Sequence, residues 1–142
     1  MNVLCVSFLL LIILLTLFAG GCSQQPSAQG DANSDVEYTL TTAMDAGRMV
    51  FKGVGGEIDG MTNPDLTALQ GETVRITLIN GDDMPHDLAI PEVNAATSVI
   101  SAKGQSTEVT FGVTSAGKFS YFCTVSGHRQ VGMEGALVVG EP

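Results

Sequence analysis

The chain has 142 residues with 15 acidic and 6 basic side chains, 2 His and 3 Cys, and its formal net charge is -9. This length fits one domain with additional segments and excludes a multidomain enzyme. The six basic residues are scattered, whereas binding to a phosphate backbone needs clustered Lys and Arg, so we expect no nucleic-acid partner.

The N-terminal segment, residues 1–21, has the pattern of an export signal. Residues 3–18 are uncharged and almost wholly apolar, and the small residues Ala19, Gly20 and Gly21 precede Cys22. This run is marginal for a helix that must cross roughly 30 Å of hydrocarbon. The pattern resembles a bacterial lipoprotein signal, in which Cys22 would be the lipidated first residue of the mature chain. It lacks the usual positive charge ahead of the apolar run, and Ala19 stands where lipoproteins prefer Leu.

An uncleaved N-terminal anchor and an ordinary cleaved secretion signal therefore remain alternatives to the lipoprotein signal. All three place the remaining chain outside the cytoplasm. Residues 22–35 contain no large apolar side chain and are rich in Ser, Gln, Ala and Asp, so they predict a flexible tether. The expected location is extracytoplasmic, at the periplasmic or outer face of a bacterial membrane.

Residues 36–142 predict one all-β domain, because short β-type runs alternate with turn residues and no segment has sustained helical periodicity. The clearest run is Thr73 to Asn80, where apolar residues alternate with polar ones. Asn63 to Asp65 is expected to open a short helical turn before Leu66 to Leu69. Seven or eight strands fit a β-sandwich. The predicted strands are Val36 to Leu40, Arg48 to Val54, Thr73 to Asn80, His86 to Ile90, Thr107 to Phe111, Gly117 to Cys123 and Ala136 to Val139, with a weaker one near Ser98 to Ile100.

The residues that carry chemistry are concentrated near the C-terminus. His128 follows Cys123 after four residues and Met133 follows after four more, while the second histidine, His86, lies upstream. Taken singly, each of these residues is more commonly structural, but a free thiol on an exported protein is at risk of oxidation unless it is bonded or binds a metal. A thiolate and two imidazoles suit Cu or Zn, and a thioether favours Cu(I). Because protein side chains fill every strong position, electron transfer is the chemistry that remains.

Four sequence features resemble the cupredoxin family of blue copper proteins. They are Asn80, the Pro85-His86-Asp87 step, the Tyr121-x-Cys123 strand end and the Cys-x4-His-x4-Met loop. The loop spacing is similar to that of auracyanin and rusticyanin, and the longer pattern resembles the cupredoxin module fused to some copper nitrite reductases. The resemblance covers Val36 to Glu141 and implies a Greek-key β-sandwich with one type 1 copper. The implied ligands are His86, Cys123, His128 and Met133.

Several neighbouring residues leave alternatives open. Met84 lies two residues before His86 and competes with Met133 for the axial position, although the family spacing favours Met133. Asp87 stands where Asn is common in the family, and its carboxylate could still lock the two ligand loops through backbone hydrogen bonds. Asp82, Asp83 and Asp87 lack the spacing of a calcium loop and are expected to form a solvated turn.

The predicted function is a monomeric, membrane-tethered carrier of single electrons and not an enzyme. A second, catalytic copper would need further histidines, and the chain has 2 in total. Partners would be redox proteins such as a cytochrome c, a nitrite reductase or a terminal oxidase. We expect them to dock on a mostly apolar face formed by Met84, Pro85, Val131 and Gly132. A copper chaperone or storage protein, and the electron-donor module of a nitrite reductase system, are the alternatives.

Overall fold

The computed structural model describes residues 34–142. The predicted signal, Cys22 and nearly all of the predicted tether lie outside the described residues. Within residues 34–142, no helix is both long enough and apolar enough to span a membrane.

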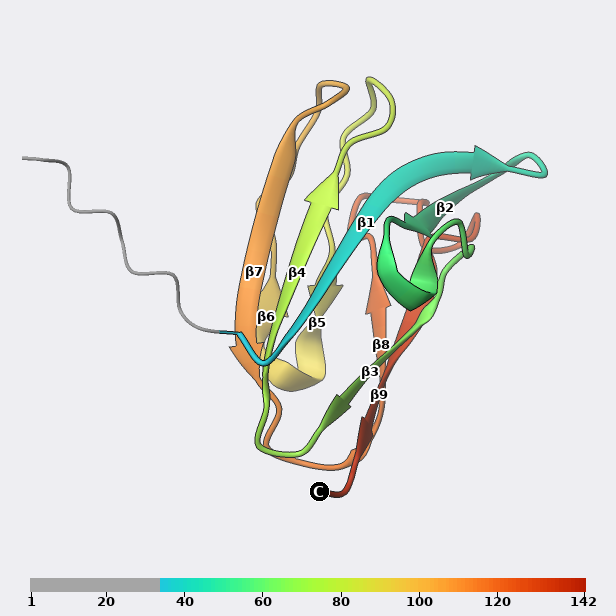
Figure 1. The fold of residues 1–142 in the computed structure, drawn as a ribbon. Helices are drawn as coiled ribbons and strands as arrows, with labels where there is room; N and C mark the ends of the chain where they lie inside the picture. Colours follow the sequence, from blue (N-terminus) through green and yellow to red (C-terminus); the bar gives the residue numbers. More distant parts are fainter. Residues whose placement is uncertain (1–33) are drawn as a thin grey trace, which may run out of the picture. The chain divides into compact units, whose positions relative to one another are not determined.

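The described residues form nine strands in two sheets, which confirms the predicted all-β sandwich (Figure 1). The four-stranded sheet has the order β2-β1-β4-β7, and the five-stranded sheet has the order β3-β9-β8-β5-β6. Two short 3-10 helices, η1 (Gly56–Ile58) and η2 (Pro91–Val93), lie in connections. The strands are β1 (Val36–Asp45), β2 (Arg48–Gly53), β3 (Asp65–Leu69), β4 (Thr73–Ile79), β5 (Ala89–Ile90), β6 (Ala95–Ala96), β7 (Ser106–Gly112), β8 (Gly117–Phe122) and β9 (Glu134–Gly140).

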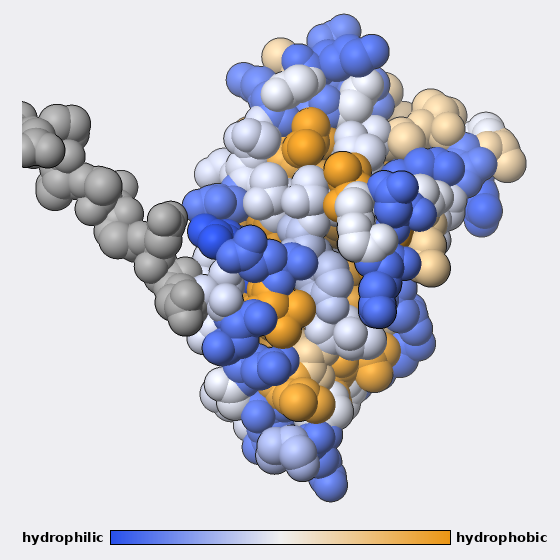
Figure 2. Space-filling model, in the orientation of Figure 1, coloured by the Kyte–Doolittle hydropathy of each residue, from blue (hydrophilic) through white to orange (hydrophobic). Residues whose placement is uncertain are grey.

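β4 shows the predicted alternation of buried and partly exposed side chains. Val74, Ile76 and Leu78 are fully buried between the sheets. β4 pairs with β1 in parallel and with β7 in antiparallel orientation, so it lies inside its sheet and has no free edge. The face of the molecule shown in Figure 2 is mostly hydrophilic, with separated apolar patches.

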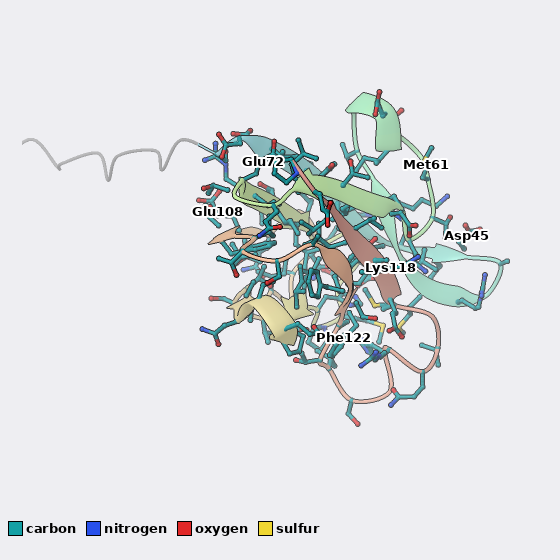
Figure 3. The ribbon with its side chains drawn as sticks, turned by 90° about the horizontal axis from the view of Figure 1, so that it is seen from below. Asp45, Met61, Glu72, Glu108, Lys118 and Phe122 are labelled. Atoms are coloured by element: carbon teal, nitrogen blue, oxygen red, sulfur yellow. The ribbon has the colours of Figure 1, made fainter. Side chains whose placement is uncertain are left out.

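The core fills the space between the two sheets. Tyr121 and Phe51 are its largest fully buried side chains, and their ring centroids lie 5.5 Å apart. The Tyr121 hydroxyl donates a hydrogen bond to the Pro64 carbonyl at 2.8 Å, which satisfies its polar atom inside the core. Figure 3 looks up at the domain from below and shows Glu72 and Glu108 at its margin.

The expectation of a helical turn at Asn63 to Asp65 was wrong. Asn63 adopts a left-handed conformation with φ 46°, and its side-chain oxygen accepts a hydrogen bond from the Phe51 amide at 2.9 Å. This turn leads into β3, in which buried Leu66 and Ala68 alternate with exposed residues and pair in parallel with β9. Tertiary pairing therefore decides the conformation of this short run.

The region around β5 and β6 also differs from the prediction. The strand expected from His86 to Ile90 is reduced to β5, and the weak strand expected near Ser98 to Ile100 is replaced by β6. His86 and Ile100 instead form an isolated bridge, with both backbone hydrogen bonds at 2.9 Å. The bridge fixes the backbone of His86 without placing it in a regular strand.

Two loops meet at one end of the sandwich. β4 ends before residues 80–88, while β8 ends and β9 begins on either side of residues 123–133. The opposite end holds the start of β1, where Val36 pairs with Val74 at the start of β4. The predicted ligands thus come from loops that are far apart in sequence and adjacent in space (Figure 1).

Candidate metal centre

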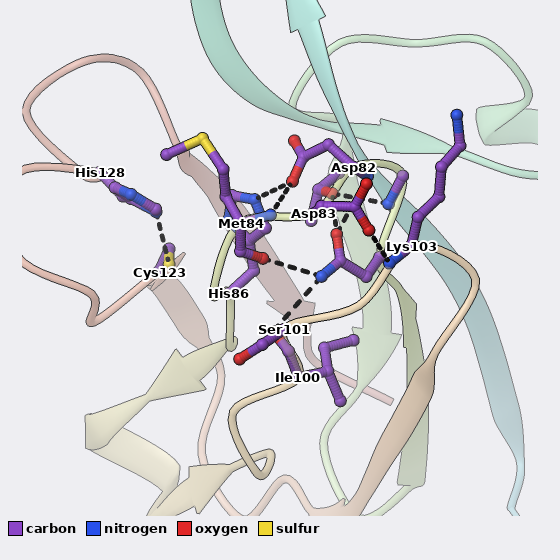
Figure 4. A network of polar contacts seen from close by, with 12 residues as sticks. Asp82, Asp83, Met84, His86, Ile100, Ser101, Lys103, Cys123 and His128 are labelled. Carbon is purple, nitrogen blue, oxygen red and sulfur yellow. Dashed lines mark hydrogen bonds and ion pairs between the residues drawn. The ribbon is translucent and has the colours of Figure 1, made fainter.

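The structure brings together the three strongest predicted ligands. The potential ligand atoms of His86, Cys123 and His128 all lie within 4.8 Å of one another, and all three residues are buried. The Cys123 Sγ lies 3.5 Å from His128 Nδ1, and the two imidazole centroids are 4.9 Å apart. Two imidazoles and one cysteine sulfur at this spacing form a compact donor set for a single ion (Figure 4).

Asn80 organises the loop that carries His86. Its side chain is 1% exposed and donates hydrogen bonds to the Met84 carbonyl at 2.8 Å and to the Ile100 carbonyl at 3.4 Å. Its side-chain oxygen accepts hydrogen bonds from the Thr42 hydroxyl at 3.3 Å and the Asp82 amide at 3.1 Å. One amide group therefore joins β1, the 80–86 turn and the segment at Ile100.

The His86 ring has one satisfied nitrogen and one unsatisfied nitrogen. Its Nε2 lies 3.0 Å from Asp82 Oδ1, while its Nδ1 is buried without a hydrogen-bond partner. An unpaired buried polar atom is costly, and native structures rarely leave one without a reason. A metal ion bound between this nitrogen, Cys123 and His128 would supply the missing partner, so the residues fit a copper or zinc ion.

Asp87 connects the two ligand loops. Its Oδ1 accepts a hydrogen bond from the Thr124 amide at 2.6 Å, and its Oδ2 accepts one from the Thr124 hydroxyl. The carboxylate thus ties the residue after His86 to the residue after Cys123, as predicted from its position. The expectation that Asp87 belongs to a solvated turn was wrong, because its side chain reaches across to the Cys123 loop and it is only 5% exposed.

The loop after Cys123 is held largely by its own backbone. The Cys123 amide donates to the Met133 carbonyl at 3.2 Å, and the Met133 amide donates to the His128 carbonyl at 3.1 Å. On the outside, Arg129 Nε donates to the Glu134 carboxylate at 2.9 Å, which pairs the residues that follow His128 and Met133. The three potential ligands on this loop are therefore fixed relative to one another.

Burial controls the electrostatics of the site. It raises the pKa of the Cys123 thiol to about 11, although backbone hydrogen bonds from Asp87 and Val125 act in the opposite direction. Burial also lowers the pKa of His128, and the nearby His86 adds to that effect. A bound cation would reverse the balance at the thiol, because coordination to a metal deprotonates a thiol.

The two candidate axial methionines have different environments. Met133 has no exposed surface and packs in the same buried cluster as Cys123, whereas Met84 is 39% exposed. A fourth donor to this buried group would itself have to be buried, so the difference in burial favours Met133.

Two residues with structural roles at the site were missed from the sequence. Asp82 was expected in a solvated turn, yet its side chain contacts the His86 ring. The sequence signal that could have indicated this contact is the position of Asp82 four residues before His86. Asn63 donates a hydrogen bond to the Gly132 carbonyl at 2.8 Å, beside Met133. Because these residues are 69 positions apart, no local pattern could have indicated the contact.

Comparisons with known proteins show a family match and similar folds. The family model described as a cupredoxin-like domain matches residues 9–139. The copper-resistant cuproprotein CopI of Rubrivivax gelatinosus is 32% identical over 92 residues, which cover 52% of this chain and 56% of CopI. The chain thus matches little more than half the length of this relative.

Solved structures of auracyanin and rusticyanin share the fold. Auracyanin B superimposes with a TM-score of 0.57 at 20% identity, covering 78% of this chain and 92% of auracyanin B. Rusticyanin from Thiobacillus ferrooxidans superimposes with a TM-score of 0.59 at 22% identity, covering 78% of this chain and 85% of rusticyanin. At these identities the likeness concerns the fold.

Proposed function

Because the chain belongs to the cupredoxin-like family, we propose that it is a type 1 copper protein that carries single electrons. The ligands would be His86, Cys123, His128 and Met133. The observation that carries the proposal is the buried, unpartnered Nδ1 of His86 beside Cys123 and His128. A metal ion would be a partner for this nitrogen.

The proposed ligand set suits electron transfer better than catalysis. Copper held here would supply a one-electron redox couple, and the protein would hold its ligands in one arrangement and keep water away from them. With Met133 as the fourth ligand, the proposed site would leave no position for a substrate, and both histidines of the chain would be used by it. We therefore propose a carrier and not an enzyme.

We further propose that redox partners dock beside His128. His128 retains 7% exposure, and the neighbouring Val131 and Met84 are 46% and 39% exposed. Together with Pro85 and Gly132 they form the docking face, a small apolar surface suited to brief contact. A cytochrome c, a nitrite reductase or a terminal oxidase could exchange single electrons at this face.

The proposed location is outside the cytoplasm, at a bacterial membrane, with lipidated Cys22 as the attachment. Two acyl chains hold a protein firmly, at about 0.8 kcal/mol per buried CH2, where one chain binds marginally. Mass spectrometry of membrane-fraction protein tests this proposal. A chain that begins at Cys22 with added lipid mass supports it, and an intact chain from Met1 or an unmodified Cys22 contradicts it.

Copper handling is the second candidate function, because the relative CopI is a copper-resistant cuproprotein. In that role the same ligands would store copper or pass it to another protein. Electron donation as a module of a nitrite reductase system is a narrower form of the first proposal. The two roles differ in whether the electron or the ion leaves the site.

Copper titration and rapid kinetics separate these roles. The protein should take up one copper per chain and become intensely coloured when oxidised. A carrier should exchange electrons with a redox protein within milliseconds in stopped flow and should retain its copper against a chelator. Rapid loss of copper to the chelator with slow electron exchange would favour copper handling, and failure to bind copper would refute both roles.

A further inference from the structure

We propose that Asp82 is a positioning residue for His86 and that its carboxylate lowers the reduction potential of the copper bound there. This inference rests on the proposed copper site. It assigns a role to the contact between Asp82 Oδ1 and His86 Nε2, which are 3.0 Å apart (Figure 4).

The contact determines which ring nitrogen of His86 carries the proton. An ionised carboxylate has no hydrogen to donate, so His86 Nε2 must be the donor. The lone pair of the neutral ring then resides on Nδ1, the buried atom that has no other partner. Asp82 thereby presents the correct tautomer of His86 to Cys123 and His128.

Asp82 is itself held in place by the turn. Its Oδ1 also accepts a hydrogen bond from the Met84 amide at 2.8 Å, and its own amide donates to Asn80 Oδ1 at 3.1 Å. The Asp82 side chain is 32% exposed, so water still solvates its charge. One carboxylate oxygen is thus fixed against the imidazole while the side chain stays partly open to solvent.

The two histidines differ in this respect. His86 has a carboxylate on Nε2, whereas the polar contact of the His128 ring is with Cys123 Sγ. A carboxylate hydrogen bond makes an imidazole a more basic ligand. A more basic ligand stabilises Cu(II) more than Cu(I), which lowers the reduction potential.

Asp83 provides a matched control for the charge. It is the adjacent carboxylate, but its Oδ1 accepts a hydrogen bond from the Lys103 amide at 3.0 Å and belongs to a different contact (Figure 4). Asp82→Asn and Asp83→Asn each remove one negative charge from the same turn. Only Asp82→Asn removes it from the His86 hydrogen bond.

The decisive measurement is the reduction potential of the full copper protein, wild type and both variants, in one buffer. Loss of a carboxylate partner of a metal-binding histidine typically weakens metal binding about 10-fold to 100-fold. We expect Asp82→Asn to weaken Cu(II) relative to Cu(I) by about tenfold, which raises a one-electron potential by about 59 mV. Asp83→Asn should shift it much less. Equal potentials in the two variants would overturn the proposal.

Nitrogen-15 NMR of His86 in the metal-free wild-type protein gives a second test that needs no variant. We expect the proton on Nε2 and an unprotonated Nδ1, and the reverse tautomer would overturn the proposal. Failure of the copper assignment has a different signature. In that case the wild-type protein would bind no copper and show no thiolate absorption, whatever the state of His86.

Discussion

The two ligand loops are built in different ways. Residues 80–87 are cross-linked by side chains, since Asn80, Asp82 and Asp87 all bond to other segments or to His86, and His86 has no exposed surface. Residues 123–133 are held largely by their own backbone hydrogen bonds, and His128, at 7% exposure, lies three residues before the exposed Val131.

Under the proposed function, this difference indicates that the two loops have different roles. The first loop fixes His86 through hydrogen bonds of its polar side chains, which restrict the orientation of the ring. The second loop supplies the thiolate, the other imidazole and the thioether, and it also reaches the surface where a partner can approach. Substitutions in the first loop should therefore change stability and potential, and surface substitutions in the second should change exchange rates.

The largest effect is expected from Cys123→Ser. A hydroxyl cannot replace the thiolate that gives the strongest bond and the charge-transfer absorption, so the intense colour should be lost completely. The domain should still fold, because Ser is nearly the same size. Visible absorption after copper addition and circular dichroism check both outcomes, and an unchanged visible spectrum would refute the site.

Asn80→Ala should weaken the first loop most strongly. It removes the partner of the partly buried Met84 carbonyl and of the buried Thr42 hydroxyl. Buried groups left unsatisfied cost about 1–3 kcal/mol each, so we expect a loss of about 3 kcal/mol in the free energy of unfolding. Urea unfolding of the metal-free protein measures it. Gln70→Ala removes an exposed side-chain hydrogen bond to the Thr114 carbonyl and should cost far less.

Met133→Gln should lower the potential while copper stays bound. The harder oxygen donor gives up the preference of the thioether for Cu(I). We expect a decrease of at least about 59 mV, the value for a tenfold change in a one-electron couple. Met84→Gln is the matched control and should leave the potential unchanged. The opposite ranking would assign the axial position to Met84.

The smallest effect is expected from Val131→Glu, which changes the surface of the second loop. A charge on the docking face should slow electron exchange by roughly tenfold or less, because it must lose water when the partner docks. Copper affinity and spectrum should stay the same. Stopped-flow exchange with a cytochrome c measures the rate, and an unaffected rate would exclude this face as the docking site.

The features that the sequence predicted share one property, which is that local patterns encode them. Alternation in Thr73 to Asn80 predicted a half-buried strand, and the Cys123, His128 and Met133 spacing predicted ligands on one loop. The pairing of β3 with β9 and the contact of Asn63 with Gly132 join distant segments, so no local pattern could reveal them.

Asp82 and Asp87 show the same limit within a single turn. Both are acidic residues in a polar stretch, for which solvation is the ordinary expectation. Their side chains instead bond to His86 and Thr124. Which carboxylate faces inward depends on the backbone of the turn, and Asn80 and the bridge at Ile100 set that backbone.

The direction of β1 determines at which end of the domain the preceding chain joins it. Val36 lies beside Val74 at the start of β4, and the ligand loops follow the other end of that strand. At about 3.3 Å per residue, the length of β4 places roughly 20 Å between the two ends. A segment that precedes Val36 would therefore join the domain at the end opposite the candidate metal centre. The proposed docking face would then lie at the end of the domain farthest from the start of β1.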